Sequence, residues 1–286
     1  MIKQEHKNLV SIKRACELCK VWRSGYYKWL RRPEKRDVDI LGQKIKRIFQ
    51  KSRKTYGTRR IKKQLEVEGI AVSRQRIRRT MAEQGLVAKA GRKTRATTNS
   101  NHDHPVAPNL LGREFEVDDP NKVWVTDITY LATSEGWLYL AVVLDLYGRR
   151  IVGWSIGKRM TKELVIDALE TAIKRRNPSS GIICHSDRGS QYCSHAYQKL
   201  LQKHGFLYSM SRKGECQDNA CAETFFHSLK VEWIYGEPLR SRYQMKQDVR
   251  EYIEVFYNRQ RLHSKNGYLS PCDFERVYLS SFLLSA

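Results

Sequence analysis

From residue 121 onward, strand-like and helix-like segments follow one another in an order that few folds accept. Three runs rich in β-branched and aromatic residues come first, at residues 123–130, 138–144 and 151–156. Helix patterns and short strands then alternate, at about residues 161–175, 182–184, 194–204, 206–210 and 218–231. The order βββαβαβα predicts an α/β domain with a mixed sheet that begins as an antiparallel meander.

The positive charge of the chain is concentrated in its first third. The 286 residues hold 53 Lys and Arg against 30 Asp and Glu, a net charge of +23. Residues 1–100 contain 29 Lys and Arg against 8 Asp and Glu, whereas residues 101–286 contain 24 against 22. Apolar residues at 41% and aromatic residues at 10% exclude a disordered basic tail. The chain therefore has a folded basic region, for which nucleic acid is the expected partner.

The basic region has the layout of a helix-turn-helix unit. Residues 39–50 repeat apolar side chains with helical spacing, and Thr58 is the expected cap of a short second helix. Ser73 is the expected N-cap of a third helix, whose inner face holds Ile77 and Met81. Four arginines form its outer face: Arg74, Arg76, Arg78 and Arg79. This layout predicts a DNA reader, and the alternative is a three-helix bundle with a basic surface.

A small helical element precedes this unit and a linker follows it. Two interpretations of Cys16 and Cys19 stay open: two small residues on a buried helix face, or half of a zinc site without a second pair of ligands. The segment after the third helix mixes Gly, Thr, Asn, Pro and basic residues without periodicity, as linkers do. We therefore expect four parts: a helical element that is a candidate for DNA binding (1–35), a helix-turn-helix domain (36–86), a linker (87–117) and a catalytic domain with a helical tail (118–286).

Cysteine usage and hydropathy predict a soluble protein of the cytosol. The seven cysteines are odd in number and irregularly spaced, which argues against a disulfide framework. The N-terminal residues lack the apolar segment of a secretory signal. The longest apolar run, residues 138–144, is far shorter than the roughly 20 residues that cross a bilayer. No membrane association is expected.

Three acidic residues stand where the predicted α/β layout makes an active site. Asp127 lies within an apolar strand, where a carboxylate is costly unless it is neutralised. Asp187 ends a strand beside a glycine, and Glu223 lies on a helix. Three gathered carboxylates repel one another, and divalent cations relieve that repulsion. Oxygen ligands suit Mg²⁺, with Mn²⁺ as a substitute, and two ions roughly 4 Å apart can assist an attacking and a leaving oxygen at phosphorus.

Two further residues share the helical face of Glu223. His227 follows at i+4 and Lys230 at i+7, about 10 Å along the same stripe. We expect Lys230 to hold a DNA phosphate close to the metal site. For His227 two roles stay open, a DNA contact or a hydrogen-bonded core histidine.

The three acids lie in motifs that resemble those of a known family. The motifs read W-V-T-D-I-T-Y (124–130), H-S-D-R-G-S-Q-Y (185–192) and D-N-A-C-A-E-T-F-F-H-S-L-K (218–230). They resemble the acidic motifs of bacterial insertion-sequence transposases in the retroviral-integrase (DDE) group. In that group the third acid follows the second after 35 intervening residues, as Glu223 follows Asp187.

The resemblance extends over nearly the whole chain. The tail Y-N-R-Q-R-L-H-S (257–264) matches, although the family usually has proline at the place of Leu262. The segment R-S-G-Y-Y (23–27) matches too, although Trp22 stands at the place of the usual serine. The block that begins with Y-G-T-R-R-I (56–61) resembles the helix-turn-helix region of the same proteins, which adds Arg59 and Arg60 to the expected DNA contacts.

The resemblance implies a ribonuclease-H-like catalytic domain that holds metal through Asp127, Asp187 and Glu223. The implied reaction is metal-dependent cleavage at the ends of a mobile element, followed by attack of the freed 3′-hydroxyl on target DNA. The implied partners are the terminal inverted repeats, target DNA and further copies of the chain. In this family such a chain is commonly the second reading frame, OrfB, which acts with or is fused to an upstream product, OrfA. The implied location is the bacterial cytoplasm, in association with the nucleoid.

Two other functions stay open on the sequence. A nuclease of the same fold would cut nucleic acid without joining it, but such an enzyme needs neither the basic first third nor the C-terminal tail. A regulator encoded by the element would occupy the inverted repeats without chemistry, but it would not need three acids. A strand-transfer assay separates the transposase from the nuclease, and activity of the isolated chain with Mg²⁺ separates both from the regulator.

Overall fold

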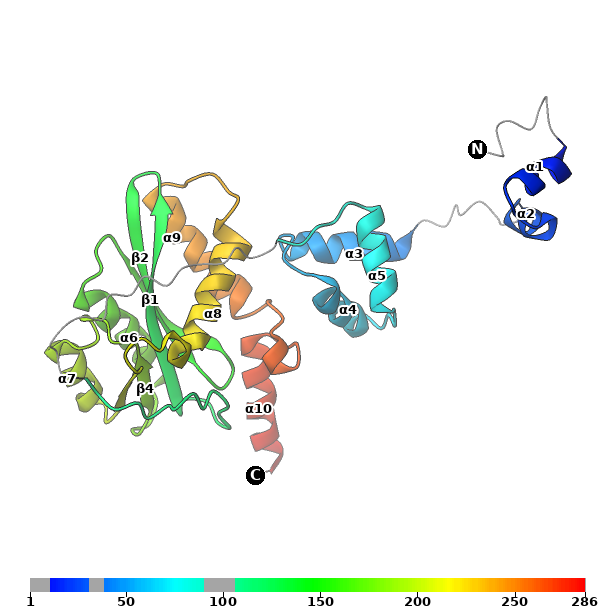
Figure 1. Ribbon diagram of the computed structural model, residues 1–286. Helices are drawn as coiled ribbons and strands as arrows, with labels where there is room; N and C mark the ends of the chain where they lie inside the picture. The colour runs from blue at the N-terminus through cyan, green and yellow to red at the C-terminus, as the bar shows by residue number, and fades with distance from the viewer. Residues whose placement is uncertain (1–10, 31–38, 90–105, 286) are drawn as a thin grey trace. The chain divides into compact units, whose positions relative to one another are not determined.

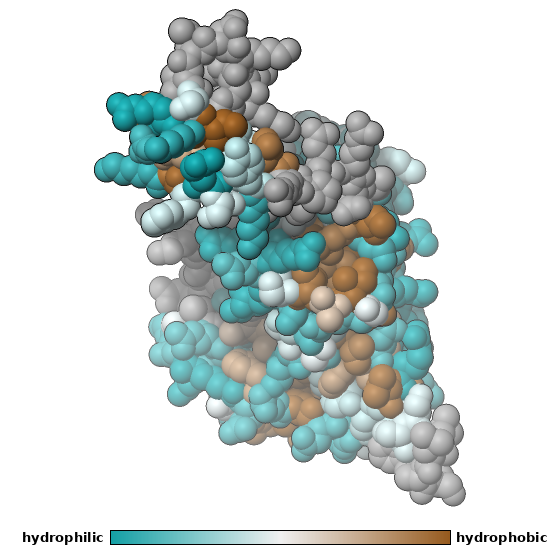
Figure 2. Space-filling model, turned by 90° about the vertical axis from the view of Figure 1, so that its right-hand side faces the viewer, coloured by the Kyte–Doolittle hydropathy of each residue, from teal (hydrophilic) through white to brown (hydrophobic). Residues whose placement is uncertain are grey.

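The computed structural model describes residues 11–30, 39–89 and 106–285. The chain divides into two compact units, Met1–Lys44 and Ile45–Ala286. Most of the expected linker, residues 90–105, lies outside the described residues. None of the described helices is both long enough and apolar enough to span a bilayer. Figure 2 shows a face on which hydrophilic residues predominate and hydrophobic residues form separate patches.

The first unit contains two short helices, α1 (Ile12–Leu18) and α2 (Arg23–Leu30). Cys16 is the buried side chain of α1 and Tyr26 that of α2. Cys19 is exposed and lies just after the end of α1. The interpretation of the cysteines as two residues on one buried face is therefore wrong, because the turn that ends α1 directs Cys19 to solvent.

We call residues 45–89 the helical module. It contains three helices, and the first of them begins earlier, at Ile40. They are α3 (Ile40–Lys51), α4 (Thr58–Val67) and α5 (Arg74–Glu83). The inner faces of these helices supply an apolar core, since every third or fourth residue is aliphatic or aromatic. Its buried members are Ile45, Ile48, Phe49, Ile61, Leu65, Ile77 and Met81.

The starts of α4 and α5 test two sequence predictions. Ser73 is the N-cap of α5, as predicted, and its side chain accepts a hydrogen bond from the Arg76 amide at 3.2 Å. Thr58 is not a cap: it is the first residue of α4, and Gly57 is the N-cap. The Gly57 carbonyl accepts from the Ile61 amide at 3.1 Å, so the helix begins one residue before the position that side-chain capping predicts.

Five strands form one mixed sheet in the order β3-β2-β1-β4-β5. β1, β2 and β3 pair antiparallel, and β4 and β5 continue the sheet parallel to β1. β1 pairs with β4 over only three residues, so among the described residues most of that edge of β1 has no strand beside it. The strands are β1 (Val123–Thr133), β2 (Gly136–Asp145), β3 (Arg150–Gly157), β4 (Ile183–Ser186) and β5 (Leu207–Met210).

Helices cover both faces of this sheet (Figure 1). One face packs on α6 (Lys162–Arg176) and α7 (His195–Lys203) through a continuous buried cluster. Helix α6 approaches β3 so closely that a Cβ on Gly153 would lie 2.2 Å from the Ala168 carbonyl oxygen, which explains the glycine. On the other side lie α8 and α9 with the segments that extend them. These later elements are η1 (Cys216–Asn219), α8 (Ala220–Leu229), η2 (Lys230–Ile234), α9 (Arg242–Arg250), η3 (Glu251–Tyr257), η4 (Ser264–Asn266) and α10 (Pro271–Ser285).

The predicted fold class is confirmed. All five strands and the helices between them occur in the expected order, within a few residues of the expected bounds. One predicted helix, at 218–231, differs in detail. It comprises a 3₁₀ turn (η1), the α-helix α8 and a π-helical segment (η2) that continues α8 without a break. π-Helical turns of this kind occur frequently at functional sites.

Candidate active site and DNA-binding surface

Asp127 lies just beyond the point where β1 loses its parallel neighbour. It is two residues past Val125, the last β1 residue that pairs with β4, and it faces Val142 of β2 in the register. The side chain is half-buried, and its Oδ1 accepts a hydrogen bond from the Ile128 amide at 2.8 Å. The carboxylate therefore stands at an open edge of an otherwise apolar strand.

Asp187 follows directly on Ser186, the last residue of β4. Because β4 runs parallel to β1 and beside it, the chain that leaves β4 emerges next to Asp127. The Gly189 amide donates to Asp187 Oδ1 at 3.0 Å and orients the carboxylate. The two aspartates thus come from adjacent strands and meet at one end of the sheet.

Glu223 completes the group from the first turn of α8. The start of this helix is attached to β1, because the Asn219 side chain donates to the Thr126 carbonyl at 3.3 Å. That bond joins the residue before α8 to the residue before Asp127 and brings Glu223 towards the two aspartates. Glu223 itself is exposed on the helix.

The three carboxylates affect one another electrostatically. Burial and the charge of Asp187 raise the pKa of Asp127 well above its usual value. Partial burial and Asp187 also raise the pKa of Glu223. Asp127 and Glu223 therefore resist ionisation beside the charge of Asp187, which is the electrostatic condition that a bound cation relieves.

The donor set suits a hard divalent cation. The three side chains offer six carboxylate oxygens, the ligand type that Mg²⁺ and Mn²⁺ take. Across the described ranges, no three His, Cys, Asp or Glu side chains already lie close enough to hold one ion. Glu223 is the exposed member of the three.

Lys230 lies close to Asp127, at the C-terminal end of α8. It is the first residue of η2, and its Nζ lies 4.7 Å from the ring centroid of Tyr130, on β1. Burial lowers the pKa of Lys230, and the charge of Asp127 opposes that shift. His227 is exposed, one turn from Glu223. Its exposure disfavours the core-histidine interpretation.

Sequence reasoning missed the residue that fixes the start of α8. Asp218 is fully buried, and its carboxylate accepts from Arg113 Nε at 2.6 Å, Asn109 Nδ2 at 3.0 Å and Arg212 Nη2 at 3.1 Å. The hydrogen bonds from Arg212 come first among the causes that hold its pKa below the usual range. The sequence could have indicated Asp218 by one signal: it is the first residue of the third motif, five residues before Glu223.

The histidine of the second motif is structural. His185 is fully buried on β4, and its ring nitrogens hydrogen-bond Ser209 at 2.8 Å and Ser211 at 3.1 Å. Burial lowers its pKa to about 4, so the ring is neutral at physiological pH. Its position two residues before Asp187 therefore reflects packing of β4 on β5 and not ligand chemistry.

The expected DNA contacts fall into two groups. The four arginines of α5 and Arg59 of α4 have exposed side chains, of which Arg79 pairs with Glu83 at 3.1 Å. Arg60 is different: it is half-buried, and its Nη1 lies 3.5 Å from Glu232 Oε1. Burial and the neighbouring Arg261 lower its pKa. The side chain of Arg60 is directed at a carboxylate and not at solvent.

Comparison with known families identifies both parts of the chain. Residues 35–94 match the model of an HTH-like domain. Residues 117–216 and 223–279 match two models of an integrase core domain. The match over residues 117–216 contains Asp127 and Asp187, and the match over residues 223–279 contains Glu223.

Relatives cover almost the entire sequence. "Insertion element IS600 uncharacterized 31 kDa protein" of Shigella sonnei is 47% identical over 92% of this chain and 98% of its own length. "Transposase InsF for insertion sequence IS3A" of Escherichia coli is 44% identical over 97% of this chain and 98% of its own length. Among solved structures, the HTLV-2 integrase catalytic core in complex with magnesium is 15% identical, with a TM-score of 0.41 over 54% of this chain and 96% of that one. Identity of this extent to IS3 transposases, with both family models matched in order, shows that the chain belongs to the insertion-sequence transposases that carry an integrase core domain.

Proposed function

We propose that the chain binds the ends of a mobile DNA element and catalyses cleavage and strand transfer there. The observation that carries this proposal is the approach of Asp127, Asp187 and Glu223 to one another at one end of the sheet, where burial and the charge of Asp187 raise the pKa values of Asp127 and Glu223. The transposases of Escherichia coli that share 44% of its residues support the choice of a mobile element as substrate.

The three carboxylates would hold Mg²⁺, or Mn²⁺ in its place, and two ions fit the reaction better than one. When bound, the metal supplies activation of an attacking oxygen and stabilisation of a leaving oxygen on phosphorus. Asp127 and Asp187 bind from fixed positions on the sheet, whereas Glu223 closes the site from α8. Lys230 binds a phosphate of the DNA beside them, since its ammonium already lies near Asp127. His227, exposed on the same helix, contacts the DNA.

The helical module recognises the DNA sequence. Helix α5 presents its arginines to the major groove, with Arg59 of α4 on the phosphates, and this arrangement fits the matched HTH-like model. We assign Arg60 to the protein interior because of its contact with Glu232. Further copies of the chain and an upstream-frame product are the proposed protein partners, and association with the bacterial nucleoid follows from DNA binding. The proposed boundaries remain 1–35, 36–86, 87–117 and 118–286.

An oligonucleotide assay tests the proposal. The full chain, with the upstream product added, is incubated with Mg²⁺ and a duplex that carries the terminal sequence of its own element. Wild type should cut one strand and join the freed 3′ end to a second duplex. Asp127→Ala, Asp187→Ala and Glu223→Ala should each abolish both steps and leave DNA binding intact. Asp167→Ala, an exposed carboxylate on α6, is the matched control and should keep full activity.

Each outcome has a distinct meaning. Cutting without joining would identify a nuclease, and binding without either step would identify a regulator. An alanine variant of the triad that joins at the wild-type rate would remove that residue from the active site.

A further inference from the structure

The helical module and the third catalytic carboxylate are attached to the same helical rod. Helix α8, which bears Glu223, continues without interruption into η2. Glu232 and Trp233 lie in η2, about 14 Å along the rod from Glu223 at 1.5 Å per residue. Both η2 residues are buried, and both contact side chains of the helical module.

Arg53 makes the first of these contacts. Its guanidinium carbon lies 3.4 Å from the centroid of the Trp233 ring, a stacked cation–π arrangement. The same guanidinium forms an ion pair with Glu251, at 2.6 Å between Nη2 and Oε1. Arg53 therefore joins the end of α3 to both η2 and η3.

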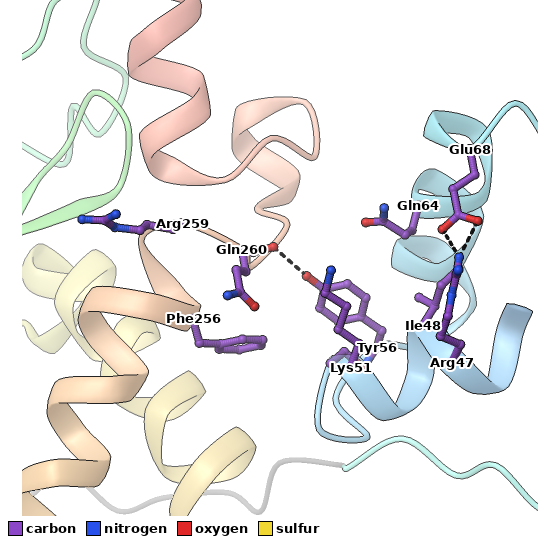
Figure 3. Close-up of a pocket in the computed structure, with 10 residues that line it drawn as sticks. Arg47, Ile48, Lys51, Tyr56, Gln64, Glu68, Phe256, Arg259 and Gln260 are labelled. Atoms are coloured by element: carbon purple, nitrogen blue, oxygen red, sulfur yellow. Dashed lines mark hydrogen bonds and ion pairs between the residues drawn. The ribbon is translucent and has the colours of Figure 1, made fainter.

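Tyr56 makes the second contact (Figure 3). Its side chain is buried, and its hydroxyl donates to the Gln260 carbonyl at 3.2 Å and accepts from the Leu262 amide at 2.8 Å. Both hydrogen-bonding capacities of the hydroxyl are used on backbone groups more than 200 residues away in the sequence. Such a bond has a fixed direction, so it defines an orientation as well as a proximity.

Arg60 makes the third contact, with the carboxylate of Glu232. That carboxylate is also bound by Arg261 through two hydrogen bonds of 2.7 Å and by the Tyr252 hydroxyl at 3.0 Å. Arg60 thus attaches to a group that is itself held rigidly, and not to a mobile surface acid. We call Arg53, Tyr56 and Arg60 the docking residues.

Two lysines of the helical module add polar contacts to those of the docking residues: Lys89 pairs with Glu237 at 3.2 Å, and the Lys63 ammonium lies 5.9 Å from the centroid of the Tyr268 ring. Beside them lies an open cleft of about 630 Å³, between α3 and the residues that follow η3. Its lining includes Lys51, Gln64, Phe256 and Arg259, which Figure 3 shows around Tyr56 and Gln260. Since a cleft and not an apolar interface occupies this region, the position of the module depends on the docking residues. Removal of one should therefore loosen it, and removal of two should release it.

We propose that the docking residues set the distance between the recognised DNA sequence and the catalytic carboxylates, and so select the phosphodiester that is cut. This inference rests on the proposed function. A helical module joined to the catalytic domain only by a flexible linker would allow several phosphodiesters to reach the carboxylates, whereas a docked module allows one. A displacement of 1 Å at a reacting group can cost about a hundredfold in rate. Arg53, Tyr56 and Arg60 are positioning residues, since none touches the reacting atoms.

The test compares Arg53→Ala and Tyr56→Phe with a control, Arg47→Ala. Tyr56→Phe keeps the ring and removes only the hydroxyl. Arg47 pairs with Glu68 at 2.6 Å, so its variant loses an ion pair of similar geometry that stays within the helical module. All four proteins, the wild type included, are assayed on a labelled terminal duplex, and the cut positions are mapped at nucleotide resolution.

Wild type and Arg47→Ala should cut at one phosphodiester. The two docking variants should bind the duplex within about twofold of wild type, yet cut at several neighbouring positions, with the rate at the original position lowered by about 10–100-fold. A merely structural role would lower the yield without moving the cut. A single cut at the original position and rate in both docking variants overturns the inference, and so does a loss of DNA binding that accompanies the loss of cutting.

A second measurement tests the docking without any activity. In wild type, urea unfolding followed by circular dichroism and by tryptophan fluorescence should give coincident transitions, because module and core unfold together. The double variant Arg53→Ala/Tyr56→Phe should give two transitions. Coincident transitions in the double variant overturn the docking itself. A wild type that docks but never cuts DNA contradicts the proposed function and, with it, the selection of a cut position.

Discussion

Glu232 is a buried negative centre among the C-terminal helices, and its removal should destabilise the fold strongly. Its side chain is 8% exposed and that of Arg261 is 7% exposed. Arg261 donates two hydrogen bonds of 2.7 Å to the two carboxylate oxygens, and the Tyr252 hydroxyl donates a third at 3.0 Å. In Glu232→Ala the Arg261 guanidinium would stay buried without an anion.

The expected destabilisation follows from that unpaired charge. Breaking a buried ion pair on one side costs about 3–5 kcal/mol, because the remaining ion keeps its desolvation penalty and loses its partner. Glu232→Gln keeps the shape and one acceptor oxygen, so it should cost less, about 1.5–3 kcal/mol. Glu170→Ala is the control: its pair with Lys174 is solvent-exposed, and its removal should change stability by less than about 0.5 kcal/mol.

Urea unfolding measures these differences. With a slope of about 3 kcal/mol per molar, the Glu232→Ala midpoint should fall by about 1–1.7 M below that of wild type. The double variant Glu232→Met/Arg261→Met, which removes both charges, should recover most of the lost stability. A Glu232→Ala protein within about 1 kcal/mol of wild type, or a double variant no better than the single one, would refute the argument from burial.

Three further predictions concern the active site, the DNA reader and the sheet. Lys230→Ala should lower the joining rate and make it more sensitive to salt, whereas Lys230→Arg should keep most of the rate. If Lys230→Ala gives the wild-type curve of joining rate against salt, this lysine does not contact the DNA. Replacement of the exposed α5 arginines by glutamine should reduce the slope of log affinity against log salt by about 0.9 for each phosphate that is no longer neutralised. It should also weaken sequence preference where the replaced arginine contacts a base. Gel-shift titrations at four salt concentrations measure both effects, and unchanged binding excludes α5 as the helix that recognises the DNA. Burial raises the pKa of Asp145 from 3.8 to about 6, so the folded protein favours the protonated carboxyl. The contribution of this carboxyl to the free energy of unfolding is therefore greatest below pH 4 and declines as the pH rises through 6. Asp145→Asn, which does not titrate, should therefore cost less stability at pH 7 than at pH 4, and equal costs in urea unfolding at the two pH values would contradict the shift.

Local patterns in the sequence determined the elements and their order. Alternating β-branched and aromatic residues defined the strands around Asp127, and Ser73 marked the start of α5 by a capping bond that spans three residues. These signals depend on neighbours within one element, which a single sequence displays directly. The confirmed fold class and family follow from them, together with motifs long enough to be specific.

Part of the active site was also within reach of the sequence. The two aspartates meet because parallel neighbouring strands end at the same edge, a rule that needs only the strand order. Their assignment as metal ligands, with Glu223, stays a prediction. The contact of the Lys230 ammonium with the Tyr130 ring was not within reach, because Tyr130 lies on another element, β1, 100 residues earlier in the chain.

Tertiary structure alone decided which basic residues are exposed and which hold the protein together. Arg59 and Arg60 are adjacent and chemically identical, yet Arg59 is exposed and Arg60 turns to Glu232. Asp218, likewise, is buried against Arg113 and Asn109, which lie more than 100 residues earlier in the chain. None of these partners can be read from local periodicity, since the free energy of a buried charge depends on the groups that packing brings around it and not on its neighbours in the chain.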